Sequence, residues 1–373
     1  MGGRLINFWV EVVVVGNETY ITTGLRPLVV TRSHLMELPR KILIGEDVLK
    51  EIGDFIETPK SARVVVASGT NVQERVREVV GSSLRCSVGW VVVTHSDMKN
   101  VHNMMKASQC AHCIIGLGGG KSVDVGKLAA SKLGVPFFSV PTSASHDGIA
   151  SPFASINDSK RHYSIKAKPP VGILADVKVI AAAPTRLFAA GCGDLVSKLT
   201  AVRDWQLGHE ATGEYYGGYA ASLALMSAHV VIDDAASLGR YGLPAVRDLV
   251  EALISTGVAA GIAGSSRPCS GSEHLFSHSL DAICPGRGLH GEQCGIGTIM
   301  MAKLQGLDWR GVRSALKRVR APTKASQLMI GDDEVVQALV GAEAIRPDRY
   351  TILSKVRLDR DAARRLAEET GVI

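Results

Sequence analysis

The segment Cys113-Ile-Ile-Gly-Leu-Gly-Gly-Gly-Lys-Ser-Val-Asp124 passes from an apolar run through three glycines into a helix-compatible stretch. A short apolar run bounded by glycines is typical of a strand that is buried on both faces of a parallel sheet. Glycines after such a strand let the backbone approach a pyrophosphate, whose charge is met by N–H groups at the start of the next helix. The segment therefore predicts a strand, a dinucleotide-binding turn and a helix. Its spacing is neither that of the P-loop nor G-x-G-x-x-G, so a turn that only packs a strand on a helix is the alternative.

Four further β-rich apolar runs flank this segment, at Arg63–Ser68, Trp90–His95, Val135–Val140 and Val171–Leu174. Helix-compatible stretches, Asn71–Val80 and Asp97–Ala107, lie between them. This alternation predicts an α/β fold in which a Rossmann-like parallel sheet is covered on both faces, with ligands bound beyond the carboxyl ends of the strands. We assign residues 36–183 to this dinucleotide-binding domain.

The pattern changes after about Pro184. Three Ala- and Leu-rich segments with a spacing near 3.6 follow, at Leu195–Leu207, Tyr219–Ala236 and Ala245–Ile262. They predict an all-helical C-terminal domain over residues 184–373, which should bind metal and substrate. We expect the active site in the cleft between the two domains.

Composition narrows the class of protein. The 373 residues are 46% hydrophobic and 21% charged, with a net charge of +6, which is typical of a globular chain that needs two domains. No basic stripe interleaved with aromatic residues suggests nucleic-acid binding. The longest apolar stretches fall short of the roughly 20 residues that span a bilayer, and seven cysteines, an odd count, do not suit a secreted disulfide framework. We therefore expect a cytoplasmic protein with no nucleic-acid partner and no membrane insertion.

The segment Pro141-Thr-Ser-Ala-Ser-His-Asp-Gly-Ile-Ala-Ser151 ends another expected strand. Its small hydroxyl residues suit hydrogen bonds to a cofactor, and Asp147 is placed to receive a substrate hydroxyl. A helix N-cap is the alternative, because Ser, Thr and Asp favour that position.

Histidines and a carboxylate in the second half suggest a metal site. His274 and His278 are four residues apart and thus share a helical face, and Leu289-His290-Gly-Glu adds a third histidine. Asp194, in Gly191-Cys-Gly-Asp194, is expected to begin a helix. Two histidines and one carboxylate leave coordination positions open for a substrate, as in catalytic metal sites.

Five motifs together resemble one family, archaeal sn-glycerol-1-phosphate dehydrogenase, within the superfamily of iron alcohol dehydrogenases and dehydroquinate synthases. They are GGGKSVD (118–124), PTSASHDG (141–148), CGDLVSK (192–198), GSEHLFSH (271–278) and LHGEQCGIGTIMM (289–301). The resemblance extends from about Met36 to Ile373. It implies reduction of dihydroxyacetone phosphate with NADH or NADPH, homo-oligomers, and a role in making the glycerophosphate backbone of archaeal membrane lipids.

Residue roles carry over from the same resemblance. It implies that Asp194, His274 and His290 hold one zinc ion per subunit, and that Asp147, Asp194 and His278 bind substrate and take part in catalysis. The cofactor-binding residues that it implies are Gly120, Lys121, Ser122, Val123, Asp124, Thr142, Ser143, Ala144, Ser145 and Ser151.

Four rival interpretations remain at this point. Dehydroquinate synthase, a lyase, shares the histidine motifs, but it has Glu where Asp194 stands and its basic substrate segment differs from Lys160–Pro170. Glycerol dehydrogenase is nearer in reaction but has no phosphate to bind. A non-catalytic dinucleotide sensor would not need intact metal ligands, and an RNA-associated protein would need a basic and aromatic stripe.

Three further expectations concern the N-terminal extension, the site for the substrate phosphate and the choice between NADPH and NADH. Residues 1–35 lie outside the resemblance, and although Ile6–Ile21 is strand-like, we expect this extension to be dispensable. The substrate phosphate could be held by a basic cluster, which is equally well a solvated loop face: Arg161, His162, Lys166 and Lys168. Gly69-Thr70-Asn71, after the strand Arg63–Ser68, offers no acid to repel a 2′-phosphate, so both NADPH and NADH should be used.

Overall fold

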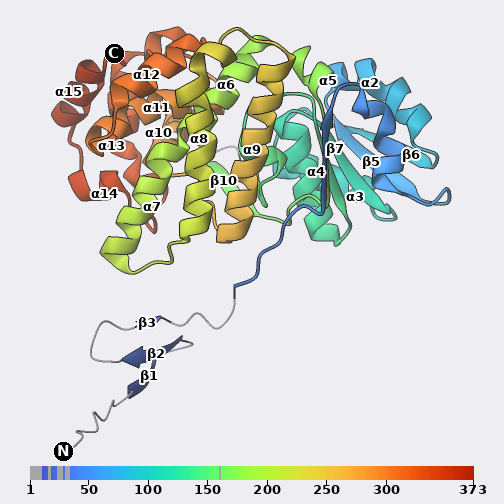
Figure 1. Cartoon of the computed structure of the whole chain (residues 1–373), viewed down its shortest axis with the longest axis horizontal. Coiled ribbons are helices and arrows are strands. Elements are labelled where there is room, and N and C mark those ends of the chain that lie inside the picture. The colour runs from blue at the N-terminus through green and yellow to red at the C-terminus, as the bar shows by residue number, and fades with distance from the viewer. Residues whose placement is uncertain (1–10, 16–17, 23–27, 30–33, 159–160) are drawn as a thin grey trace, which may run out of the picture. The chain divides into compact units, whose positions relative to one another are not determined.

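A computed structural model describes residues 11–15, 18–22, 28–29, 34–158 and 161–373 (Figure 1). Residues 1–36 and 37–373 form two separate units. The described part of the first unit is an antiparallel sheet of β1 (Glu11–Val15), β2 (Glu18–Thr22) and β3 (Leu28–Val29). The start of the strand-like run expected from Ile6 lies outside the described residues.

The second unit contains a six-stranded sheet with the order β4-β11-β8-β7-β5-β6, and every neighbouring pair is parallel. Its strands are β4 (Lys41–Gly45), β5 (Arg63–Ser68), β6 (Ser87–Val92), β7 (Cys113–Gly118), β8 (Phe137–Pro141) and β11 (Gly172–Asp176). The expected strands are all present, although β6 begins before Trp90 because Ser87 pairs with Arg63. Strand β4 was not predicted.

Alternate residues of each strand face two separate cores. Val64 and Val66 of β5 pack with η1 (Val48–Glu51), α1 (Ile52–Ile56) and α2 (Thr70–Ser83). Val65 and Ala67 face the other side, where α3 (Met98–Ala107) and α4 (Gly120–Leu133) lie. Because both faces are covered, both sets of side chains are apolar, as in other parallel sheets.

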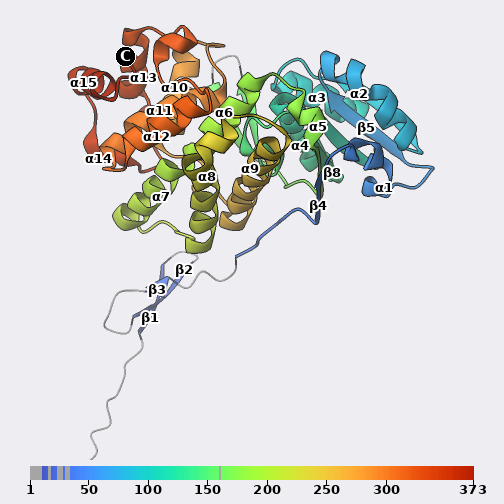
Figure 2. The same ribbon diagram turned by 45° about the horizontal axis from the view of Figure 1, so that its top comes forward.

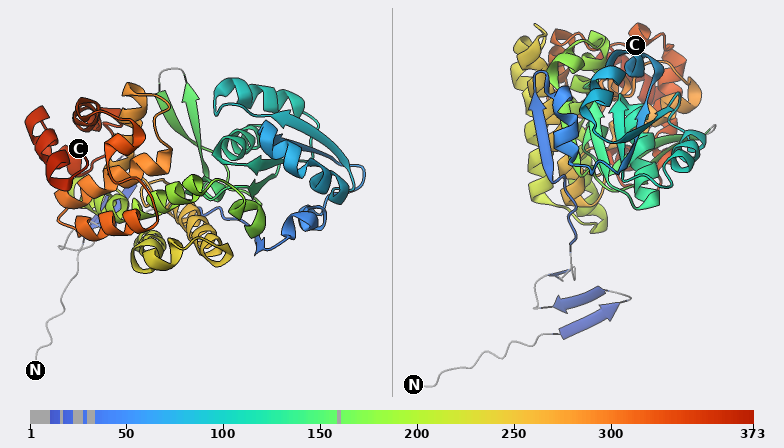
Figure 3. Two further views of the ribbon diagram at one scale, coloured as in Figure 1. Left: turned by 90° about the horizontal axis from the view of Figure 1, so that it is seen from above. Right: turned by 90° about the vertical axis from the view of Figure 1, so that its right-hand side faces the viewer.

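A β-hairpin stands between the sheet and the helical part (Figure 3, left). It consists of β9 (Phe153–Asp158) and β10 (Arg161–Lys166), which pair antiparallel and follow the short helix η2 (Asp147–Ile149). Strand β9 contacts α3 and α4, whereas β10 contacts α10. Neither strand of this hairpin was predicted.

All described elements after β11 are helical, which confirms the expected fold class; the domain boundaries remain a prediction. The helices are α5 (Val177–Ala181), α6 (Thr185–Val196), α7 (Lys198–Thr212), α8 (Gly218–Leu238), α9 (Leu243–Ala263), α10 (Ser272–Ile283), α11 (His290–Leu304), α12 (Trp309–Arg318), η3 (Ala325–Leu328), α13 (Asp332–Gly341), η4 (Glu343–Ile345), α14 (Ile352–Val356) and α15 (Arg360–Thr370).

Helices α7, α8 and α9 stand side by side (Figure 2). Within the described part of the chain, α8 alone is long and apolar enough, by length and composition, to cross a membrane. Core helices share that composition, and Ala220, Ala224, Ala228 and Val231 of α8 are buried. The helix therefore carries little weight as evidence for a membrane span.

The expected position of Asp194 at the start of a helix is wrong. Helix α6 begins at Thr185, directly after Pro184, and Asp194 lies in its last turn. A new helix, α7, then starts at Lys198, so the single segment expected over Leu195–Leu207 is divided. The glycines before Asp194 looked like a helix start but serve close helix packing instead.

Candidate active site

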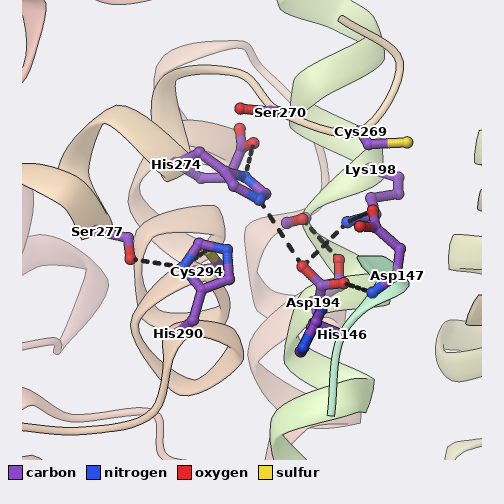
Figure 4. A network of polar contacts seen from close by, with 12 residues as sticks. His146, Asp147, Asp194, Lys198, Cys269, Ser270, His274, Ser277, His290 and Cys294 are labelled. Atoms are coloured by element: carbon purple, nitrogen blue, oxygen red, sulfur yellow. Dashed lines mark hydrogen bonds and ion pairs between the residues drawn. The ribbon is translucent and has the colours of Figure 1, made fainter. Parts of the chain in front are cut away.

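Four side chains that can bind a metal meet where α6, α10 and α11 come together (Figure 4). Asp194 comes from the end of α6, His274 from the first turn of α10, His290 from the start of α11 and Cys294 from the next turn. One ligand atom from each lies within 4.8 Å of the others. The structure thus brings together the three predicted ligands and adds Cys294.

Glycines allow α6 and α11 to approach closely enough for this. A Cβ on Gly193 would overlap the carbonyl oxygen of Gly291, and a Cβ on Gly291 would overlap that of Ala190. Only residues without a side chain fit at both positions, so the glycines beside Asp194 and His290 are needed to bring these two ligands together.

Glu273 orients His274. One of its carboxylate oxygens accepts hydrogen bonds from His274 Nδ1 (2.8 Å) and from the backbone N–H of Gly271 (2.7 Å), and the other accepts from the Thr200 hydroxyl (2.7 Å). With Nδ1 engaged, His274 Nε2 faces Asp194 Oδ1 at 3.7 Å. A carboxylate behind a ligating histidine fixes its tautomer and increases its basicity.

A second relay orients His290. The Ser277 hydroxyl donates to Gln293 Oε1 (2.6 Å) and lies 3.3 Å from His290 Nδ1. Because the only proton of that hydroxyl goes to Gln293, its oxygen accepts from Nδ1 and leaves Nε2 of His290 available to a cation. Glu292 of the His-Gly-Glu motif is not a ligand: it accepts the Leu289 N–H (2.7 Å) and binds Arg186, so it caps α11.

Asp147 approaches Asp194 from the loop after β8. Its backbone N–H donates to Asp194 Oδ2 (2.9 Å), and its side chain contacts the ammonium group of Lys198 (3.0 Å). The same ammonium group lies 3.0 Å from Asp194 Oδ1. These contacts join the loop at the carboxyl end of β8 to the helical part of the protein, at the position of the metal ligands.

Burial shapes the charges of this site. It lowers the pKa of His274 to about 4, with help from Lys198, and together with His274 it lowers the pKa of His290 well below its ordinary value. Both rings are therefore neutral near pH 7, the form that binds metals. Burial opposes the charge of Asp147, but Lys198 outweighs it and lowers the pKa of that carboxyl to about 2.

These donors fit a metal ion of the zinc type. Neutral imidazoles, a carboxylate and a thiol are all ligands that zinc accepts. Burial raises the pKa of the Cys294 thiol, so this side chain loses its proton only where a cation compensates the charge.

His278 lies one turn after His274, as expected from its spacing. Its ring stacks on that of His290 with centroids 5.7 Å apart, and its centroid is 6.5 Å from that of His274. Unlike His274, it is only partly buried. His278 thus borders the metal ligands on a more accessible side.

The predicted cofactor segments meet at the carboxyl ends of β7 and β8. Gly118 pairs with Pro141, and the Thr142 N–H donates to the Gly118 carbonyl (3.0 Å). The residues of these segments that are at least partly accessible are Gly119, Gly120, Lys121, Thr142, Ser145, His146 and Asp147.

The other predicted cofactor residues are buried: Ser122, Val123, Asp124, Ser143, Ala144 and Ser151. Three of them have identified neighbours inside the protein. Asp124 accepts the Ser155 N–H (3.2 Å) and lies 3.4 Å from Lys127, and Ser151 accepts the Phe153 N–H (3.2 Å). Ala144 is buried against Gly191. Through these internal contacts, Asp124, Ser151 and Ala144 hold the two segments in place.

Sequence reasoning missed three residues of the site. Cys294 follows His290 by four residues and Lys198 follows Asp194 by four, so helical spacing could have found both, and Glu273 precedes His274 directly. The basic cluster proposed for the phosphate is only partly described: Lys166 and Lys168 are exposed, and the side chains of the other two members lie outside the described residues.

The chain is similar in sequence and in fold to known proteins. A family model described as iron-containing alcohol dehydrogenase matches residues 43–184. A probable glycerol dehydrogenase from Sinorhizobium meliloti 1021 has a similar fold, with a TM-score of 0.75 and 20% identity, covering 91% of this chain and 100% of that structure.

Two curated relatives are much closer in sequence. Glycerol-1-phosphate dehydrogenase (NAD(P)+) of Cenarchaeum symbiosum is 53% identical over 346 residues, which cover 91% of this chain and 97% of the relative. The enzyme of the same name from Nitrosopumilus maritimus is 49% identical over 348 residues, which cover 92% and 98%. The chain therefore belongs to the NAD(P)+-dependent glycerol-1-phosphate dehydrogenase family of oxidoreductases.

Proposed function

We propose that the protein reduces dihydroxyacetone phosphate to sn-glycerol 1-phosphate with NADPH or NADH, and that it uses one zinc ion per subunit. The observation that carries this proposal is the convergence of Asp194, His274 and His290 beside the loop that holds Asp147. A bound zinc ion supplies Lewis acidity toward the substrate ketone, and the nicotinamide supplies the hydride.

The residues of the chain would share the remaining tasks. Asp194, His274 and His290 would hold the ion, with Cys294 as a further donor. Asp147, kept ionised by Lys198, would accept a hydrogen bond from the substrate hydroxyl.

His278 is proposed to handle the proton. It borders the ligands on the accessible side, where it could donate a proton to the oxygen that hydride transfer makes basic, directly or through water.

The cofactor is proposed to bind along β7 and β8. Backbone N–H groups at the start of α4, from Gly120 to Asp124, would meet the pyrophosphate. The loop from Thr142 to Ser145, with Ser151 behind it, would complete the dinucleotide site. This arrangement is supported by the hydrogen bond between Thr142 and Gly118.

The wider setting is proposed from the family resemblance of the five sequence motifs. We propose a cytoplasmic homo-oligomer whose product is the glycerophosphate backbone of archaeal membrane lipids, with no nucleic-acid partner.

One assay panel tests the proposal. Oxidation of NADPH would be followed with dihydroxyacetone phosphate, with dihydroxyacetone and with a seven-carbon acid phosphate, each with and without a chelator. We expect turnover with the first substrate alone, its loss with the chelator, and product of the sn-1 configuration. Preference for dihydroxyacetone would point to a glycerol dehydrogenase, and elimination from the seven-carbon acid to a lyase.

A further inference from the structure

Lys198 is a fully buried lysine, and burial of its charge is energetically unfavourable. It is the first residue of α7, and its side chain has an exposed fraction of 0%. Burial of an ammonium group carries a desolvation cost. Ion pairs of this kind are often replaceable by apolar residues without loss of stability. The stability of the fold alone therefore does not explain this lysine.

The contacts of Lys198 place it beside the metal ligands. Its Nζ lies 3.0 Å from Asp147 Oδ2 and 3.0 Å from Asp194 Oδ1. Asp194 Oδ2 is already engaged by the backbone N–H of Asp147, and Oδ1 is the oxygen that faces His274 Nε2. A cation held by Asp194 and His274 must therefore bind the same oxygen that Lys198 contacts. Two like charges so close together repel each other strongly in a buried site.

The charge balance suggests why the lysine is kept. Asp147, Asp194 and the carboxylate of Glu273 behind His274 contribute negative charges around the metal position. Lys198 adds one positive charge to this group, whatever ion is bound. Hydride transfer to a ketone creates one negative charge on its oxygen, which a positive site stabilises. With a neutral residue in place of Lys198, the same group with its dication would be more negative by one charge.

We propose that Lys198 is a positioning residue that bridges Asp147 and Asp194, weakens metal binding and raises turnover by adding one positive charge to the metal-loaded site. The effect on turnover rests on the proposed function, whereas the effect on metal binding does not.

Zinc affinity of the metal-depleted, full-length protein gives the first test. We expect Lys198→Met to bind zinc at least about tenfold more tightly than the wild type in competition with a chromogenic chelator, because a repelling charge is gone. Lys127→Met is the matched control. Lys127 is also fully buried, but it contacts Asp124 and the carbonyl oxygens of Gly148 and Phe153 instead of Asp194.

The control should keep its zinc affinity within about threefold of the wild type, because it removes no charge beside Asp194. Mere structural damage at Lys198 would weaken zinc binding, which is the opposite sign. Unchanged or weaker binding by a folded Lys198→Met protein overturns the proposal. If that variant is insoluble, Lys198→Gln, which is also neutral, is measured in its place with the same expected result.

Turnover gives the second test. In zinc-saturated Lys198→Met, kcat should fall by about 100-fold with a much smaller change in KM, because the loss affects the charge that forms during hydride transfer. Lys198→Arg keeps the charge and should recover part of kcat together with the wild-type zinc affinity. Tighter zinc binding in a protein whose wild type does not reduce dihydroxyacetone phosphate would refute the proposed function but uphold the effect of Lys198 on the metal. Wild-type kcat in zinc-saturated Lys198→Met would overturn the catalytic half of the proposal.

Discussion

Replacement of Glu273 should weaken metal binding without removing a ligand. Glu273 Oε1 accepts from both His274 Nδ1 and Gly271 N, whereas Oε2 accepts only from Thr200. In Glu273→Gln, the amide oxygen can stay at the Oε1 position and keep both hydrogen bonds, with the NH₂ group toward the Thr200 hydroxyl. The geometry then survives, and the hydrogen bond to the imidazole changes from charge-assisted to neutral.

The size of the effect follows from that change. Charge-assisted hydrogen bonds are about twice as strong as neutral ones, so the loss should be about 1–1.5 kcal/mol, close to tenfold in zinc affinity. Glu273→Leu removes the acceptor altogether and should cost about 100-fold, the upper end for partners of ligating histidines.

Competition with a chelator at pH 8 measures both variants against Thr200→Val. This control removes one hydrogen bond to Glu273 but leaves the bond to His274 intact, so zinc affinity should change by less than about threefold. Wild-type zinc affinity in Glu273→Gln, or a loss of affinity in Thr200→Val as large as that in Glu273→Leu, would refute this role of Glu273.

Four further outcomes are expected. His274→Ala should lose bound metal and turnover together, whereas His278→Ala should keep most of its metal while turnover falls; equal metal loss in both would contradict the division of roles. Thr70→Asp, at the start of α2, should weaken NADPH binding by about tenfold more than NADH binding, through repulsion of the 2′-phosphate; unchanged NADPH affinity would mean that the ribose lies elsewhere. Burial and the charge of Glu273 raise the pKa of Asp204 from an ordinary 3.8 to about 6, so its ionisation destabilises the fold as pH rises through this range. The unfolding free energy of the wild type relative to Asp204→Asn should therefore fall by roughly 2.4 kcal/mol between pH 4 and 7, and a pH-independent difference in chemical denaturation would disprove the shift. Finally, the chain beginning at Met36 should fold and turn over normally, because residues 37–373 form a unit of their own; an insoluble or inactive product would contradict this.

Local patterns were sufficient for most of the fold. Buried parallel strands are apolar along their whole length, so β5, β7, β8 and β11 could be read directly, and the 3.6-residue periodicity revealed the long helices. Strand β4 was missed because it lies at the sheet edge, and its burial is incomplete. The β9–β10 hairpin was missed because its alternation of apolar and polar residues, at Ala154–Asn157 and Tyr163–Lys166, is only four residues long in each strand.

For the site, the sequence by itself determined the types of ligand and one spacing. His274 and His278 share a helix face whatever the rest of the chain does, and the three predicted ligands lie together in the structure. Sequence spacing could not show which of the two faces the metal position, because that depends on how α10 packs against α11.

Only the tertiary structure decided how distant segments meet. Asp147 and Asp194 are 47 residues apart, yet one donates its N–H to the other and both contact Lys198. In the sequence, Gly193 and Gly291 cannot be distinguished from glycines of helix caps or turns. Only the packing of α6 on α11 shows that they permit close contact between these two helices. Such contacts between segments far apart in the chain arise from the packing of the whole unit, which no local pattern encodes.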